Sequence, residues 1–149
     1  CRSTAPSNER MIFSIKTTIQ DLSKSGKAHK WKDCECPSCL RKMWGHGFVL
    51  RYFSECEGGL FLKRYRCPKC GVVATTRPEG YWSRIRSSIA TIYRSLRSRL
   101  NLLTWPEGFP RQRGSHWLRR FVALSKMELK PSLPAFLEFC FSQQLRFFA

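Results

Sequence analysis

Acidic side chains are scarce in this sequence: 10 Asp and Glu stand against 27 Lys and Arg, a formal net charge of +17 over 149 residues. Such an excess repels itself unless a polyanion is near, which indicates nucleic acid or, less often, an anionic membrane surface as the partner. A solvated basic surface with no specific partner is the plainer alternative. The hydrophobic content of 42% can support a core, so wholesale disorder is not expected.

Long apolar runs are also missing. The sequence has no stretch of about eighteen apolar residues, which excludes a transmembrane helix, and we expect no membrane partner. We recognise no signal peptide, no internal repeat and no low-complexity tract. Residues 1–10 have the character of read-through, a fusion scar or a fragment boundary, with Met11 as the expected natural start.

A catalytic constellation is missing too. No cysteine, histidine and acid occur at a spacing that supports nucleophilic catalysis, so we expect no enzymatic activity. His46 and His116 could ligate a metal, but an isolated histidine more often lies at the surface or in packing.

What the sequence does contain is two Cys-x-x-Cys pairs, each with proline after the first cysteine. This spacing lets two thiolates on one tight turn bind the same ion, and two such pairs are typical of a closed, tetrahedral structural Zn²⁺ site. Gly71 permits a left-handed residue where the backbone turns under the metal. The ligands predicted for Zn²⁺ as the cofactor are Cys36, Cys39, Cys67 and Cys70.

Other uses of the cysteines have to be weighed. Two disulfides require an oxidising compartment, and a redox Cys-x-x-Cys normally occurs once, within a βαβ pattern that is absent here. An iron–sulfur cluster also takes four cysteines, and ligand count does not exclude it. Cys34 could replace Cys36, although Cys36 has the better spacing to Cys39. Cys140, among phenylalanines, is expected to be a buried small hydrophobe.

The segment between the two pairs has the pattern of a β-hairpin. Apolar and aromatic residues over 43–53 and alternation over 60–66 predict two strands joined by a Gly-Gly turn, and 72–76 predicts a third. The predicted fold class is α+β: a small zinc ribbon with a three-stranded antiparallel sheet over residues 33–78, followed by a helical region. A unit this small depends on its metal for much of its stability, on the order of ten kcal/mol.

Residues 1–32 are expected to form an N-terminal arm. The stretch 11–22 fits a short helix or a strand, and Thr18 with Asp21 resembles a helix-capping pair. Residues 23–32 are polar and basic, which predicts a linker that either contacts phosphate or is solvated.

After the ribbon the hydrophobic period becomes helical, and residues 79–149 are expected to form a DNA-binding region of about three helices. Apolar residues recur at helical spacing from Ile85 to Leu100, with Ser83 as N-cap. Ser115 caps a second helix, and a third runs from Ser132 to about Phe147. The outline is that of a helix-turn-helix, although the first connection is longer than in a compact one.

The helical region is strongly basic: Ser83 to Lys126 contains ten Lys or Arg and one acid, Glu107. Neutralising phosphates gives affinity without base specificity, and a helix that carries arginines can read guanine in a major groove. A helical hairpin with solvated arginines is the alternative. The residues predicted to contact nucleic acid are Arg86, Arg94, Arg97, Arg111, Arg113, His116, Arg119 and Arg120.

The order of these motifs resembles the N-terminal zinc-ribbon segments of bacterial insertion-sequence transposases and their small accessory proteins. The most specific part is the run Arg64-Tyr65-Arg66-Cys67-Pro-x-Cys70-Gly71, and the resemblance covers Cys34 to about Pro78. It implies binding of duplex DNA at transposon ends, in the bacterial cytoplasm with the nucleoid. The family's catalytic domain needs an Asp-Asp-Glu triad, and the two aspartates here both precede the ribbon. The resemblance therefore implies an accessory, regulatory or truncated protein.

Two other classes of function remain open. An RNA-binding or ribosome-associated ribbon would use exposed aromatic residues, here Tyr52, Phe61 and Tyr65, to stack on unpaired bases. A protein-interaction adaptor would use the Phe-rich last helix as its docking face.

Overall fold

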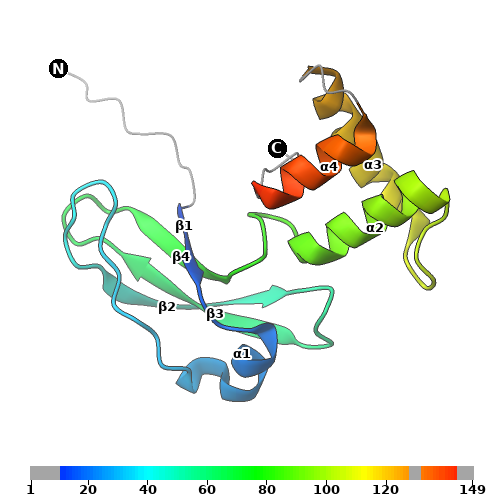
Figure 1. The fold of residues 1–149 in the computed structure, drawn as a ribbon. Coiled ribbons are helices and arrows are strands. Elements are labelled where there is room, and N and C mark those ends of the chain that lie inside the picture. The colour runs from blue at the N-terminus through cyan, green and yellow to red at the C-terminus, as the bar shows by residue number, and fades with distance from the viewer. Residues whose placement is uncertain (1–10, 128–131, 144–149) are drawn as a thin grey trace. The chain divides into compact units, whose positions relative to one another are not determined.

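The computed structural model describes residues 11–127 and 132–143, and the chain divides into two compact units after Arg86. We call them the sheet unit and the helical unit (Figure 1). The predicted α+β class is confirmed. The sheet unit contains β1 (Met11–Ile15), α1 (Ile19–Ser25), the 3₁₀ turn η1 (Gly26–Ala28), β2 (Trp44–Tyr52), β3 (Gly59–Arg66) and β4 (Val73–Pro78), and the helical unit contains α2 (Ile89–Leu102), α3 (Arg111–Met127) and α4 (Leu133–Ser142).

The strands form one mixed sheet in the order β1-β4-β3-β2. The β2–β3 and β3–β4 pairs are antiparallel, as predicted for the ribbon. The prediction of a three-stranded antiparallel sheet is nevertheless wrong, because β1 adds a fourth strand parallel to β4, with Met11 opposite Ala74. A parallel neighbour is joined by a long crossover and not by a hairpin turn, so no local feature of the sequence marks this pairing.

The helix α1 packs onto the sheet. The predicted capping pair is present: the Thr18 hydroxyl accepts a hydrogen bond from the Asp21 amide at 3.1 Å and donates one to the Asp21 carboxylate at 2.7 Å. Ile19 and Leu22 of α1 are buried in a cluster with Phe53, Leu60 and Leu62. Residues 11–32, expected as a separate arm, therefore supply a strand and a core helix to the sheet unit.

The sheet unit has two hydrophobic clusters, and β3 contributes to both. Leu60 and Leu62 lie in the cluster with α1, whereas Tyr65 lies in a second cluster that contains Cys36 and Cys67. Side chains alternate along a strand, so Leu62 and Tyr65, three positions apart, belong to opposite faces of the sheet. The sequence alternation over 60–66 predicted this division.

In the helical unit, α2 begins five residues after the start implied by the predicted cap at Ser83. Its N-cap is Ser88, whose hydroxyl accepts from the Thr91 amide at 3.1 Å. The residues before it are turned back by Arg84, which has a left-handed φ of 63°, and the Ile85 amide donates to the Trp82 carbonyl at 3.2 Å. The turn competes with the helix for these residues, and a left-handed residue cannot continue an α-helix.

The start of α3 was also predicted wrongly, at Ser115 instead of Arg111. Gly114, which suggested a break, lies inside the helix, and a Cβ atom there would be 2.7 Å from the ring of Trp105. Glycine is therefore required because it lets the Trp105 ring pack closely against the helix, and not because the chain turns at this position. For α4, Ser132 is the N-cap as predicted, while Phe147, the expected end, lies outside the described residues.

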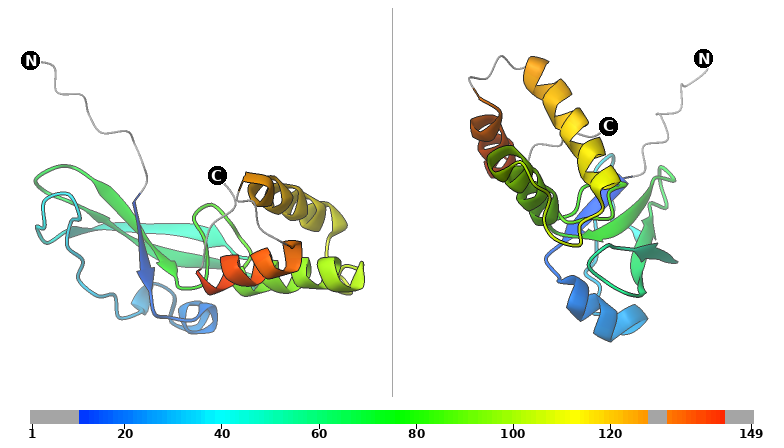
Figure 2. Two further views of the ribbon diagram at one scale, coloured as in Figure 1. Left: turned by 45° about the horizontal axis from the view of Figure 1, so that its top comes forward. Right: turned by 90° about the vertical axis from the view of Figure 1, so that its right-hand side faces the viewer.

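The helical unit has its own core, in which α2 packs against both α3 and α4 (Figure 2). The predicted apolar stripes face inward, and Cys140 is buried as expected. Phe121 of α3 stacks on Phe136 of α4 with ring centroids 5.4 Å apart. None of the helices in the described part of the chain is long and apolar enough to cross a membrane. The buried apolar residues are Ile89, Ile92, Leu96, Trp117, Phe121, Phe136, Leu137 and Cys140.

Candidate metal centre and basic surfaces

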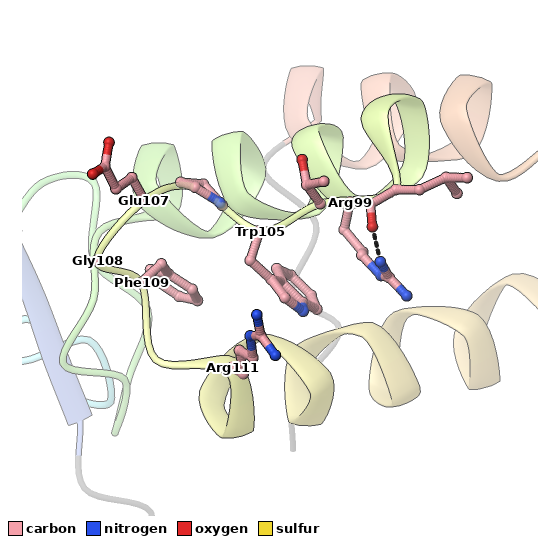
Figure 3. Close-up of a pocket in the computed structure, with 9 residues that line it drawn as sticks. Arg99, Trp105, Glu107, Gly108, Phe109 and Arg111 are labelled. Atoms are coloured by element: carbon pink, nitrogen blue, oxygen red, sulfur yellow. Dashed lines mark hydrogen bonds between the residues drawn. The ribbon is translucent and has the colours of Figure 1, made fainter.

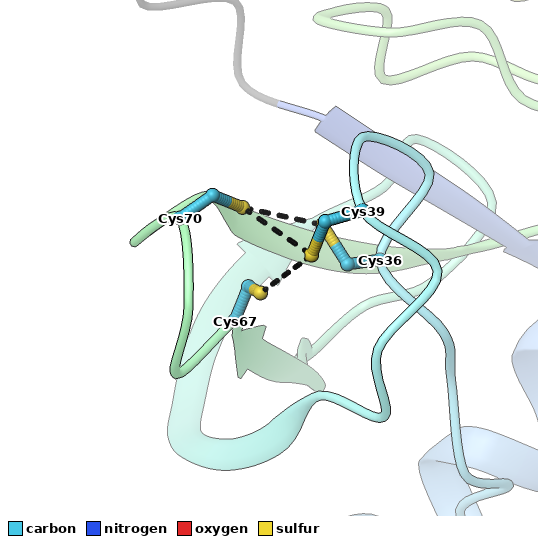
Figure 4. Close-up of side chains that lie close together, drawn as sticks. All are labelled: Cys36, Cys39, Cys67 and Cys70. Atoms are coloured by element: carbon cyan, nitrogen blue, oxygen red, sulfur yellow. Dashed lines mark hydrogen bonds between the residues drawn. The ribbon is translucent and has the colours of Figure 1, made fainter.

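The structure brings the four predicted cysteines together at one end of the sheet unit (Figure 4). All four sulfur atoms lie within 4.8 Å of one another. The sulfur of Cys36 is 3.4 Å from that of Cys70, and the sulfur of Cys39 is 3.4 Å from that of Cys67. Each close pair joins one turn to the other, so the cluster connects segments that are far apart in the sequence.

These distances suit a single metal ion. A tetrahedral ion with metal–sulfur bonds of about 2.3 Å needs sulfurs about 3.8 Å apart, which is inside the range found here. A disulfide needs about 2.05 Å between sulfurs, and all described cysteines are free thiols. The cluster could therefore hold a metal ion.

The two Cys-x-x-Cys turns have the same backbone hydrogen bonds. In the first, the Cys36 amide donates to the Arg41 carbonyl at 2.8 Å, and the Leu40 amide donates to the Cys36 carbonyl at 2.7 Å. In the second, the Cys67 amide donates to the Val72 carbonyl at 2.9 Å, and the Gly71 amide donates to the Cys67 carbonyl at 3.1 Å. The local sequence thus folds each pair into the same turn, and both turns could hold one ion.

Backbone amides also point at the sulfurs. The Cys70 amide donates to the Cys67 sulfur and is the main reason that the pKa of this thiol falls to about 6. Burial acts to raise the pKa of Cys36, but hydrogen bonds from the Ser38 amide, the Cys70 thiol and the amide and thiol of Cys39 together outweigh it, and the pKa is lowered. Donors of this kind stabilise thiolates, the form that binds metal.

The other two thiols have raised pKa values. The Val72 amide acts to lower the pKa of Cys70, but the nearby thiols of Cys67 and Cys36 outweigh it and raise the value to about 12. The Arg41 amide has the same lowering effect on Cys39, and the neighbouring thiols and burial again raise the pKa overall. Four thiolates this close together repel one another, so full deprotonation requires a cation among them.

A hydrophobic cluster supports the metal end from one face of the sheet. Met43 and Tyr65 are buried in it beside Cys36 and Cys67, and Phe13 of β1 packs against it. The Tyr65 hydroxyl donates to the Lys32 carbonyl at 2.6 Å, which ties the segment before the first turn to β3. Burial is the main cause that raises the pKa of Tyr65 to about 12.

The residue after the second cysteine differs between the two turns, which gives a test. Gly71 and Leu40 occupy equivalent places with left-handed φ values of 72° and 57°, and the Leu40 side chain is 75% exposed. Gly71→Ala is expected to destabilise the metal-bound protein by about 1–2 kcal/mol, because only glycine adopts this conformation without strain. Leu40→Gly should leave stability unchanged or raise it by up to about 1 kcal/mol, since relief of strain opposes the added freedom of the unfolded chain.

Thermal unfolding of the metal-loaded variants measures both effects. Equal stability of Gly71→Ala and the parent protein would contradict the role of the left-handed residue.

The remaining thiols lie outside the cluster. Cys34 packs near Tyr65, and its sulfur lies 3.6 Å from the Lys32 carbonyl, so it does not replace Cys36 among the four clustered sulfurs. Cys56 packs against the cluster around α1. Within the described residues, neither His46 nor His116 joins a group that could hold a metal.

The residues predicted to contact nucleic acid are not all on one surface. Arg86 was expected on the first long helix, but it belongs to the sheet unit, and its carbonyl accepts from the Ser54 amide at 2.9 Å. On α2, Arg94 is exposed, whereas Arg97 lies 3.7 Å from the Glu138 carboxylate of α4.

The other five predicted residues, one of them a histidine, lie along α3, and all are exposed. The buried side of this helix carries Trp117 and Phe121. No acidic residue occurs in Arg111–Met127. The five residues are Arg111, Arg113, His116, Arg119 and Arg120.

The loop between α2 and α3 borders a cavity of about 570 Å³ that Arg99 and Arg111 help to line (Figure 3). The Arg99 guanidinium donates to the Leu103 carbonyl and lies 5.8 Å from the centre of the Trp105 ring. Leu103 has a left-handed φ of 59°, so Arg99 stabilises the end of α2 where the chain leaves the helix.

The exposed aromatic residues differ from those expected. Tyr52 is 55% exposed, but Phe61 is half-buried beneath the Lys27 ammonium, 4.6 Å from its ring centre. Tyr65 is buried in the metal-end cluster and cannot stack on a base. Sequence reasoning passed over Trp44, which is 67% exposed and begins β2. Its position on an edge strand distinguishes it, whereas the sequence pattern gave it only as one of the apolar and aromatic residues of a predicted strand.

Comparison of the chain with protein-family models, curated proteins and solved structures gives no match.

Proposed function

We propose that this protein binds duplex DNA through α3 and that a structural metal holds its sheet unit together. The observation that carries the proposal is the composition of α3, a helix of 17 residues with exposed arginines and no acid. Positive charge along an exposed helix matches the regular phosphates of a duplex. The proposal is one of binding and not of catalysis.

The directions of the side chains on α3 support this use. At 100° per residue, Arg119 lies about 180° from the midpoint between Trp117 and Phe121, which are buried. His116 and Arg120 lie within about 60° and 100° of Arg119 on the same scale. Among the described residues, neither Arg119 nor Arg120 forms an ion pair with an acid. Within the described residues, Arg119 and Arg120 therefore lack the ion pair that holds Arg97.

We propose Zn²⁺ as the metal. Four thiolates in a tetrahedron are typical of a structural zinc site that has no open position for a substrate. An iron–sulfur cluster binds its cysteines through separate irons and needs wider spacing than four sulfurs within 4.8 Å. Metal analysis of the purified protein should give one zinc per chain, and iron with inorganic sulfide would contradict the assignment.

Removal of two arginines tests the role of α3. The double variant Arg119→Ala, Arg120→Ala should bind duplex DNA about tenfold or more weakly at moderate salt. The slope of log K against log salt should fall in magnitude by about 2, because two phosphate contacts are lost. Fluorescence anisotropy of a labelled duplex, repeated over a range of salt concentrations, measures both quantities.

Two changes in the sheet unit provide the control. Arg51 and Arg86 are exposed arginines outside α3, so replacing both with alanine removes the same charge. The control variant should retain nearly all duplex affinity. Equal weakening of the two variants would mean that net charge alone drives binding, and unchanged binding in the α3 variant would remove this helix from the interface.

The resemblance of the ribbon to transposase-associated zinc ribbons suggests which DNA is bound. We propose an accessory role at the ends of a mobile element, without catalysis by this chain. Selection of bound duplexes from a random pool should enrich one sequence if this role is correct. Recovery of a pool with no preferred sequence would support phosphate contacts alone.

One specific observation favours a protein-interaction role. Phe139 and Phe141 of α4 are both exposed, and Phe141 stacks on Tyr93 of α2 at 4.0 Å between ring centroids. Exposed phenylalanines that form an ordered patch are suited to an apolar partner. Retention of a partner at high salt would separate this role from DNA binding, which weakens steeply as salt rises.

A further inference from the structure

The sheet carries a second basic surface at its metal end, on the face opposite Tyr65. Trp44 of β2 stands directly opposite Arg66 of β3, and Arg66 is in turn opposite Val73 of β4. Arg64, two residues earlier on β3, is opposite Thr75. Residues directly opposite each other, and residues two apart on one strand, point to the same face. We call the surface formed by Trp44, Arg64 and Arg66 the metal-end face.

Neither hydrophobic cluster includes a residue of the metal-end face. The cluster at the metal end contains Tyr65 and Ala74, which stand opposite each other in the register and therefore share the other face. The cluster around α1 is on the same side as the metal-end face, but it takes in Leu60 and Leu62, further along β3. Arg66 and Trp44 are exposed and Arg64 is half-buried. The metal-end face is therefore an accessible part of the sheet.

Trp44 has no evident structural role. Its side chain is 67% exposed, and within the described part of the chain it makes no ring or cation contact. A tryptophan in water contributes little to folding, and large exposed aromatic residues are favoured where a partner covers them. By contrast, the neighbouring Phe48 packs against Trp31, with ring centroids 6.0 Å apart, and lies under the Lys63 ammonium.

The charge of the metal-end face identifies the chemistry of the partner. The strand positions paired around Trp44 include two arginines and no acid. These positions are Arg64, Arg66, Val73, Thr75 and Ile12, the last of which lies on β1 opposite Thr75. Within the described residues, neither arginine forms an ion pair. Arginines two positions apart suit successive phosphates, and a flat aromatic ring beside them suits a base whose face is exposed.

We propose that the metal-end face binds single-stranded nucleic acid, with one base stacked on Trp44 and with Arg64 and Arg66 on the adjoining phosphates. A duplex does not fit this chemistry, because its bases are stacked on one another and their faces are covered. The surface is distinct from α3, which presents a helix to a duplex. The proposal does not depend on that function, since different residues in a different unit carry it.

Trp44→Ala tests the stacking contact. Labelled oligomers of fifteen deoxythymidines and fifteen uridines provide unpaired bases, and one aromatic–base stack accounts for about a tenfold or greater change in affinity. Both oligomers should therefore bind Trp44→Ala at least tenfold more weakly, if recognition is by base and phosphate alone. A loss confined to the uridine oligomer would still support the site and would identify RNA as its ligand through the 2′-hydroxyl.

Tyr52→Ala is the matched control. Tyr52 is also an exposed aromatic residue on β2, but it stands opposite Gly59, an odd number of positions from Arg66, and so points to the other face. This variant should bind both oligomers like the parent protein. Equal weakening by Tyr52→Ala and Trp44→Ala, or no weakening by Trp44→Ala, would overturn the proposal.

The arginines are tested through salt dependence. Arg66→Ala should lower the slope of log K against log salt by about 0.7 for the single-stranded oligomers, whereas Arg66→Lys should preserve it. The same variants should bind duplex DNA normally, and the α3 variant should bind the oligomers normally. If the duplex-binding results fail, the single-strand results can therefore still be interpreted, and the reverse also holds. Zinc content and thermal unfolding equal to those of the parent protein establish that a loss of binding is not a loss of fold.

Discussion

Cys67→Ser is expected to unfold the sheet unit at room temperature. The serine removes one of the four thiolates of the proposed metal site and leaves three, which would hold an ion poorly. A structural zinc contributes on the order of ten kcal/mol to small domains of this kind. Because the clusters on both faces share β3, loss of the metal end should also release α1 from Leu62. Two-dimensional amide spectra should lose the dispersed signals of the sheet unit, and metal analysis should show less than one ion per chain.

The helical unit provides an internal reference in this experiment. Its core consists of its own residues, such as Phe121 and Phe136, and includes none of the four clustered cysteines. Helical circular dichroism from α2 to α4 should therefore persist in Cys67→Ser. The control substitution is Cys34→Ser, which changes a nearby thiol outside the cluster and should cost about 1 kcal/mol or less. Full metal content and a cooperative sheet unit in Cys67→Ser would show that the metal does not hold this fold.

Leu22→Ala is expected to destabilise the sheet unit by about 2–5 kcal/mol. The Leu22 side chain is 1% exposed and packs with Leu60 and Leu62, so truncation removes buried apolar surface and leaves a cavity that a small unit cannot easily fill. This is a large part of the stability of a small domain. Chemical denaturation of the metal-loaded protein, followed by tyrosine and tryptophan fluorescence, measures the change.

Gln20→Ala is the control for this substitution, because it lies in the same helix and its side chain is exposed. It should change the free energy of unfolding by less than about 0.5 kcal/mol. If Leu22→Ala were as mild as Gln20→Ala, α1 would be a loosely attached arm and not part of the core. The comparison therefore decides between the arm that the sequence suggested and the packed helix in the structure.

The features that the sequence alone determined are those set by neighbouring residues. Each Cys-x-x-Cys turn closes through hydrogen bonds between residues at most five positions apart, so its geometry follows from local chemistry. The Thr18–Asp21 cap and the alternation along β3 are equally local, and both were predicted. Helical spacing likewise identified the buried stripes of α2 and α3. The prediction that the two turns meet at one cluster came from assigning all four cysteines to a single metal site.

Tertiary structure decided what depends on distant residues. The pairing of β1 with β4 involves no hairpin turn that the sequence could reveal. Gly114 was predicted to be a break because the residue that requires glycine there, Trp105, lies outside the helix. Ser88 and not Ser83 caps α2 because Arg84 turns the chain first. Tyr65 and Trp44 are both aromatic residues in strands, yet only the register with β3 and β4 buries one and exposes the other. Local propensity is set by the residues themselves, whereas burial depends on which other segment of the chain packs against them.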